Sequence, residues 1–225
     1  GDDDGLRVPP QVAPWQIVIV PMLRDNDEDA ALIDYCQGIR DALVKESAFG
    51  EPLRVLLDLK ATKSTTKRWS WIKKGAPIVI EVGGRDMAGG NVSQIRRDAL
   101  YREDGKLDSA VVTKNGCVAQ AAALLTEIQR GLYTQAKLRL DGNIATDVTD
   151  MDGLKTFFAE GVERPGWVLA QWSKPSGADL DKVEEQLKAL KLTLRNTPRD
   201  AEPADGPCIF TGAPAVERVL IARAY

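Results

Sequence analysis

The 225-residue chain contains no histidine and only three cysteines, and no apolar run approaches the roughly 20 residues that span a bilayer. Without histidine, Ser-His-Asp and Cys-His catalysis and every histidine-ligated metal are excluded. Cys36, Cys117 and Cys208 lie far apart in the sequence, so we expect no disulfide framework, a cytoplasmic location and no membrane partner. Few routes to catalysis remain. The chain also begins without methionine, and we expect it to be cut from a longer protein.

Positive charge is concentrated in residues 60–102, which we call the basic island. Ten basic and three acidic residues give the island a net charge of +7, whereas the rest of the chain has 20 basic and 30 acidic residues. One interpretation is that a polyanion binds here, with phosphates on the basic side chains and unstacked bases on Trp69 and Trp71. The other is that residues 67–74 form a solvated helix whose tryptophans point into the core. The local pattern favours neither.

The order of apolar and amphipathic segments predicts an α/β fold. After a tail over residues 1–14, a compact mixed-sheet domain with flanking helices is expected over residues 15–146. Strands are predicted at residues 16–21, 53–59, 77–82, 95–100 and 108–112, and helices at residues 27–45, 66–74 and 117–140. Thr65 or Thr66 is expected to cap the second of these helices.

A small α+β domain is expected over residues 147–225. Its predicted strands cover residues 167–172, 192–195 and 216–225, and its predicted helices cover residues 152–160 and 179–191. Thr149 or Asp150 is expected to cap the first helix. The roughly sixty residues that follow residue 166 make only a marginal core, so this domain is expected to pack against another part of the protein.

The glycine-rich residues 83–90 match neither the P-loop pattern nor G-x-G-x-x-G, and a tight turn is the favoured interpretation. Within them, Arg85 and Asp86 have the chemistry of base recognition, because arginine pairs with guanine O6 and N7 and aspartate accepts from a base amine. An ion pair between Arg97 and Asp98 is favoured over a phosphate clamp. Cys117 follows Gly116 at a helix start, where either a stabilised thiolate or, as we favour, a buried apolar thiol is expected.

These segments occur in the order found in one known family. The first 14 residues, the pattern Pro77-x-x-x-Glu81-Val-Gly83-x-Arg85-Asp86, and Gly206-Pro-Cys208 with the segment ending at Tyr225 together resemble the C-terminal part of prolyl-tRNA synthetases. The resemblance is to the type found in archaea, eukaryotes and some bacteria. It covers essentially the whole chain.

The resemblance implies that the intact enzyme activates proline with ATP and magnesium and transfers it to its tRNA, as a class II enzyme and usually as a homodimer. The catalytic domain would lie upstream in the same polypeptide, so this chain is not expected to be catalytic alone. Its own role would be to hold the anticodon stem-loop of proline tRNA. A free-standing RNA-binding or docking module derived from such a synthetase is the alternative.

The resemblance and the basic island together give a predicted set of RNA-binding residues. They are Lys67, Arg68, Lys73, Lys74, Glu81, Arg85, Asp86 and Arg96. Arg68 stands where the family has a stacking aromatic, Ile72 where it has a glutamate, and Val79 where it has an arginine. Two polar base contacts, each worth about 1–3 kcal/mol, are therefore missing, and discrimination is either weaker or rebuilt by Lys73 and Lys74.

The C-terminal part of the family binds zinc through four cysteines. In this sequence those positions align with Ser173, Ala178, Cys208 and Thr211. One ligand of four remains, so we predict no zinc and no other cofactor in this part of the protein. We expect the core to be held instead by Trp167, Trp172, Leu187 and Phe210.

Overall fold

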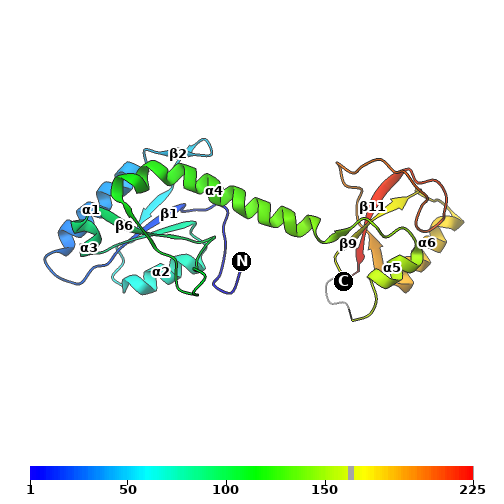
Figure 1. Ribbon diagram of the computed structural model, residues 1–225, viewed down its shortest axis with the longest axis horizontal. Coiled ribbons are helices and arrows are strands. Elements are labelled where there is room, and N and C mark those ends of the chain that lie inside the picture. The colour runs from blue at the N-terminus through cyan, green and yellow to red at the C-terminus, as the bar shows by residue number, and fades with distance from the viewer. Residues whose placement is uncertain (162–164, 225) are drawn as a thin grey trace. The chain divides into compact units, whose positions relative to one another are not determined.

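The computed structural model describes residues 1–161 and 165–224 (Figure 1). The chain divides into two compact units, Gly1–Gln135 and Ala136–Tyr225, and the first unit includes the N-terminal segment expected to be a tail. The division falls inside helix α4 (Lys114–Asp141), earlier than the boundary after residue 146 that the sequence led us to expect. Tyr225, which contributed to the resemblance, lies outside the described residues.

The first unit is built on a five-stranded mixed sheet of order β4-β1-β5-β6-β7. Its strands are β1 (Ile17–Pro21), β4 (Val55–Leu57), β5 (Ile78–Val82), β6 (Asn91–Arg96) and β7 (Ala110–Thr113). β1 is parallel to both β4 and β5, whereas β6 runs antiparallel to β5 and to β7. The central strands β1 and β5 are buried on both faces, which explains their continuous apolar sequences.

Helices cover both faces of this sheet (Figure 1). Alternate residues of β1 separate into two clusters: Ile17 and Ile19 pack with helices α1 (Asp29–Leu43) and α4, and Val18 packs with helix α2 (Ser64–Lys73). The short helix α3 (Gly84–Ala88) follows β5 directly. The predicted α/β class is confirmed, and α2 and α3 flank β5 in the sequence.

Several predicted boundaries were wrong. Helix α2 begins at Ser64, so Thr65 and Thr66 lie inside the helix and neither caps it. Residues 83–90 contain α3 instead of a tight turn, because the Asp86 carboxylate accepts the Gly83 N–H at 2.9 Å and caps the helix. Strand β6 begins at Asn91, earlier than expected. The two-residue strands β2 (Ser47–Ala48), β3 (Glu51–Pro52) and β8 (Ile144–Ala145) were missed because they are too short to leave a pattern.

The second unit has a four-stranded sheet of order β10-β11-β9-β8. Its other elements are α5 (Met151–Phe157), β9 (Trp167–Trp172), α6 (Ala178–Ala189), β10 (Leu192–Leu194) and β11 (Glu217–Arg223). The predicted cap of α5 is confirmed, since Asp150 accepts the Gly153 N–H at 2.8 Å. Across the described residues of both units, no helix combines the length and apolar character needed to cross a bilayer.

Most of the residues that were predicted to form the core of the second unit lie in it. Trp172 and Leu187 are buried, and Phe210 packs edge-on against Trp172 with ring centres 5.8 Å apart. Trp167 is the exception, because it is only half-buried and stands outside the apolar cluster. Leu154 and Ile221, which are fully buried, contribute to the core instead.

Candidate nucleic-acid interface

The basic island folds into α2, β5, α3 and β6. Arg85 follows the carboxyl end of β5, whereas Arg96 lies opposite Ile78 at the amino end of that strand. Helix α2 is held on the sheet by Ile72, which is fully buried. The helix stops at Gly75, whose φ of +79° suits glycine and whose missing Cβ leaves room for Leu6 and Val8. The N-terminal segment therefore packs against the end of the helix.

Lys67 lies on the inner side of α2, and only 4% of the residue is exposed. Its ammonium donates to the carbonyl oxygens of Asp58 and Lys60, at 3.1 and 3.2 Å. These bonds hold the loop after β4 against the helix. A direct contact between Lys67 and RNA would require them to break.

Arg68 and Glu81 form a largely buried ion pair, with Nη1 and Oε2 2.9 Å apart and side chains 19% and 7% exposed. Within the described residues, Glu81 Oε1 and Arg68 Nε are buried and have no hydrogen-bond partner. Stacking of the Arg68 guanidinium on a base would therefore compete with its bond to Glu81. The pair joins α2 to β5. Among the residues described, Glu81 keeps one unused acceptor oxygen and Arg68 one unused N–H donor.

Arg85 and Asp86 lie together in α3 but have different surroundings. Arg85 is exposed and makes no ion pair with any residue that the structure describes. Asp86 is half-buried, and its carboxylate accepts from the Gly83 N–H at 2.9 Å and from the Ser93 hydroxyl at 3.4 Å. Asp86 thus fixes the turn from which Arg85 projects.

The end of α2 carries two lysines. Lys73 and Lys74 are both exposed, and the Lys74 ammonium lies 4.3 Å from the centre of the Trp71 ring. The Trp71 indole N–H donates to Asp58 at 2.7 Å. Lys74 and Trp71 are therefore engaged with each other and with the core side of the helix.

Arg96 and Arg97 point to opposite faces of the sheet, as neighbours along a strand do. Arg96 pairs with Asp98 at 2.8 Å and with Glu127 at 2.7 Å, and the hydrogen bond to Asp98 is the main reason why the pKa of Arg96 is raised. The expected Arg97–Asp98 pair was wrong. Arg97 is 3% exposed and binds Asp2, far away in the sequence, together with the carbonyl oxygen of Ile72 at 3.1 Å.

Much of the charge of the basic island is therefore used inside the first unit. Lys67, Arg68, Arg96 and Arg97 bind carbonyl or carboxylate oxygens of the chain itself. The exposed basic groups of the island that make no ion pair in the described part of the chain are Lys60, Lys63, Lys73, Lys74 and Arg85. The surface available to a polyanion is narrower than the sequence indicated.

The two departures from the family's base-reading pattern lie side by side in the core. Ile72 and Val79 are 0% and 1% exposed and belong to the same apolar cluster. An apolar pair thus stands where the resemblance implies a glutamate and an arginine. These two positions are beneath the surface and cannot contact RNA without rearrangement.

The cysteines differ from one another in environment. Burial raises the pKa of the Cys36 thiol to about 12 and that of Cys117 to about 11, so the buried interpretation of Cys117 is confirmed. At Cys208 burial also acts to raise the pKa, but hydrogen bonds from Ser173, Thr211 and the backbone outweigh it and lower the pKa.

The residues at the family's zinc positions do not fit that metal. The Ser173 and Thr211 hydroxyl oxygens are 3.1 Å apart, and both bind the Cys208 thiol. Two hydroxyls, one thiol and the methyl of Ala178 are not the four-ligand set that structural zinc takes. Hydrogen bonds among these side chains connect the segments that a metal would join. That this part binds no zinc stays a prediction.

The sequence matches known proteins over its whole length. Residues 16–113 match the family model of the anticodon binding domain. All 225 residues align with a proline–tRNA ligase of Sphingomonas elodea at 67% identity, and with those of Sphingopyxis alaskensis and Novosphingobium aromaticivorans at 62% and 60%. The chain spans 42–44% of the length of these relatives. It therefore belongs to the prolyl-tRNA synthetase family, and its residues 16–113 form an anticodon-binding domain.

Proposed function

We propose that this chain binds the anticodon stem-loop of proline tRNA and presents it to a catalytic domain of the same polypeptide, which attaches proline to that tRNA with ATP and magnesium. The observation that carries the proposal is the edge formed by Arg85 and Asp86 at the end of β5. It lies in an anticodon-binding domain, and Arg85 is exposed and unpaired among the described residues.

The chemistry of this edge supports guanine recognition. An exposed guanidinium donates two parallel N–H groups to guanine O6 and N7. The bonds from Asp86 to Gly83 and Ser93 limit the movement of α3, so that Arg85 projects from a fixed backbone. Unpaired loop nucleotides expose the base edges that such an arginine needs.

The remaining parts of the proposal concern the intact protein. The relatives are more than twice as long as this chain and are named proline–tRNA ligases, which supports an additional catalytic domain. A homodimer, a cytoplasmic location and the absence of zinc are also proposed. The donor set around Cys208 supports the last of these.

The test is binding of the 225-residue chain to proline tRNA and to a variant of that tRNA with an exchanged anticodon, at two salt concentrations. We expect tighter binding to the proline anticodon. Arg85→Ala should remove about 1–3 kcal/mol of that preference, because it removes a bidentate base contact. Asp86→Asn should have a smaller effect, since its amide oxygen still accepts the Gly83 N–H.

The matched control is Arg40→Ala, which removes an arginine from α1, where it pairs with its neighbour Asp41. It should leave the preference between the two tRNAs unchanged. Equal binding of both tRNAs, with only a salt dependence, would replace anticodon recognition by nonspecific RNA binding. An absence of binding would favour the docking module instead.

A further inference from the structure

The two tryptophans of α2 differ in what their rings contact. Trp71 donates its N–H to Asp58, and the Lys74 ammonium lies over its ring. Trp69 is half-buried against the apolar cluster of Ile72, and its indole N–H has no hydrogen-bond partner in the described part of the chain. The Arg68 guanidinium carbon is 5.8 Å from the centre of the Trp69 ring, farther than the Lys74 ammonium is from Trp71, so Trp69 has more ring surface to offer a ligand.

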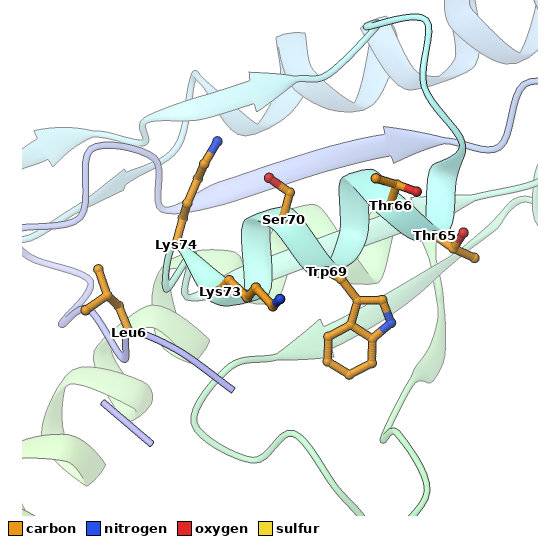
Figure 2. A pocket seen from close by; sticks show the side chains of 7 residues that line it. All are labelled: Leu6, Thr65, Thr66, Trp69, Ser70, Lys73 and Lys74. Carbon is orange, nitrogen blue, oxygen red and sulfur yellow. The ribbon is translucent and has the colours of Figure 1, made fainter. Parts of the chain in front are cut away.

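The Trp69 ring borders a hollow of about 660 Å³ beside α2 (Figure 2). Thr65, Trp69 and Lys73 follow one another at intervals of four residues, and Figure 2 shows the indole standing away from the helix between the other two. Leu6 of the N-terminal segment lies at the far end. The lining includes two lysines and no carboxylate, so the hollow is positively charged.

This combination of groups matches one nucleotide. Every base has a π face that stacks on an aromatic ring, a lysine ammonium pairs with phosphate, and a threonine hydroxyl bonds with phosphate or ribose. The volume is within the range of about 300–1,000 Å³ that is usual for ligand sites. The positive lining disfavours a basic peptide, and the aromatic ring in the lining disfavours a free inorganic anion.

We propose that the hollow is a second nucleotide subsite, in which an unpaired RNA base stacks on Trp69 and the adjoining phosphate pairs with Lys73. The subsite extends the proposed anticodon-binding function and rests on it. Arg68 links the subsite to β5, the strand that leads to the Arg85 edge: its guanidinium carbon is 5.8 Å from the centre of the Trp69 ring, and it pairs with Glu81 on β5. Neighbouring nucleotides of one loop occupy the two places.

The first experiment compares Trp69→Leu with Trp69→Phe in binding of the 225-residue chain to proline tRNA. Leucine keeps the apolar packing but has no π face, so affinity should fall about tenfold at both salt concentrations. Phenylalanine should retain most of the affinity. Tyr133→Leu, which removes an exposed aromatic from α4, is the matched control and should bind like the unchanged chain. Thermal unfolding verifies that each variant is folded.

The second experiment locates the base and the phosphate. Single abasic substitutions along the anticodon loop are combined with Trp69→Leu, and at one position the two changes should be non-additive because both remove the same stack. Lys73→Gln should reduce the slope of log affinity against log salt by about 0.7–1, whereas Trp69→Leu should leave the slope unchanged.

The outcomes separate this subsite from the function on which it rests. If Arg85→Ala weakens binding and Trp69→Leu does not, the subsite is refuted and anticodon binding stands. Equal losses in Trp69→Leu and Tyr133→Leu, or additivity at every loop position, would also refute the subsite. If the unchanged chain binds no tRNA, both proposals fall together.

Discussion

The two units of the chain bury different kinds of side chain. The buried polar and charged residues that the structure describes all belong to the first unit: Gln16, Asp58, Lys67, Glu81 and Arg97. The core of the second unit is apolar, and each ion pair found among its described residues has at least one partner that is more than half exposed. Some of these pairs join neighbours on one helix, as Lys182 and Asp179 do. In the first unit the charged groups connect segments far apart in the sequence.

The difference shows what the buried charges of the first unit do. Burying a charge costs several kcal/mol and is tolerated where a partner compensates it. Asp58, Glu81 and Arg97 all bond to residues of α2, and Lys67 belongs to that helix. Four of the five buried polar groups therefore fix the position of the helix that carries the candidate interface, whereas the described residues of the second unit bury no charged side chain.

Breaking the buried Arg68–Glu81 ion pair should give the largest difference in stability between the two units. Arg68→Met leaves the Glu81 carboxylate buried without its partner, so the free energy of unfolding of the first unit should fall by about 2–3 kcal/mol. The partial exposure of Arg68 keeps the loss below that of a fully buried pair. Hydrogen exchange of the β1 and β5 amides measures the free energy of unfolding of the first unit separately from that of the second.

Two variants control this prediction. Glu81→Gln added to Arg68→Met removes the unpaired charge and should recover part of the loss. Lys174→Gln in the second unit breaks an ion pair whose lysine is 61% exposed, and its cost should stay below about 1 kcal/mol. Equal losses for the two single variants would refute the contrast between the units.

An intermediate effect is expected where the second unit has hydrogen bonds in place of metal ligands. Thr211→Val removes a hydroxyl that binds Ser173 and Cys208, so the unit should lose about 1 kcal/mol of unfolding free energy. The pKa of Cys208 should rise in the same variant. The ultraviolet absorbance of the thiolate reports this titration, which precedes those of Cys117 and Cys36.

Ser173→Ala should shift the Cys208 titration in the same direction. An unchanged titration in both variants would mean that these hydroxyls do not stabilise the thiolate. An unchanged unfolding free energy would mean that the second unit needs no cross-link at this point.

The smallest expected effect concerns acid sensitivity of the first unit. The hydrogen bond from Arg97 is the main reason why the pKa of Asp2 is lowered, with burial acting in the opposite direction. A carboxyl that is more acidic in the folded than in the unfolded chain stabilises the fold above about pH 4, and the stabilisation is lost as the pH falls through the folded pKa. Acid should therefore weaken the unit through Asp2.

The measurement is the unfolding midpoint of the unchanged chain and of Asp2→Asn between neutral and strongly acidic pH. The unfolding midpoint of the unchanged chain should exceed that of Asp2→Asn at neutral pH, and this difference should shrink as the pH falls. Other carboxylates affect both proteins alike, and the side chain of Asp2 is 39% exposed, so the difference is small. A difference that does not vary with pH would show that Asp2 contributes no charge-dependent stability.

Local patterns sufficed to predict the main elements. The apolar runs at residues 16–21 and 77–82 identified β1 and β5, and Trp167–Trp172 was predicted with its observed bounds. The position of Arg85 and Asp86 just after a buried strand was also predicted from the sequence, and their role in binding stays a prediction. These elements depend mainly on residues that are close together in the sequence, so the local sequence pattern is enough to predict them.

The partners of the basic side chains were not predictable in this way. Arg97 binds Asp2, Arg96 binds Glu127, and Lys67 turns toward the loop after β4. Each contact depends on how distant segments meet across the sheet. A count of charges along the chain therefore overstated the surface available to RNA. The spacing of Thr65, Trp69 and Lys73 was a signal for the hollow that sequence reasoning did not use.

The packing of the N-terminal segment also determines which residues a transferable fragment of this protein must include. The family match begins at residue 16, yet the Leu6 N–H donates to the carbonyl oxygen of Lys73 at 2.9 Å, and Arg54 donates to that of Ala13 at 2.8 Å. Gly5 has a φ of +120°, and a Cβ there would lie 2.5 Å from the Lys73 oxygen. A portable version of this anticodon-binding domain must carry its first fifteen residues with it, and must keep glycine at position 5.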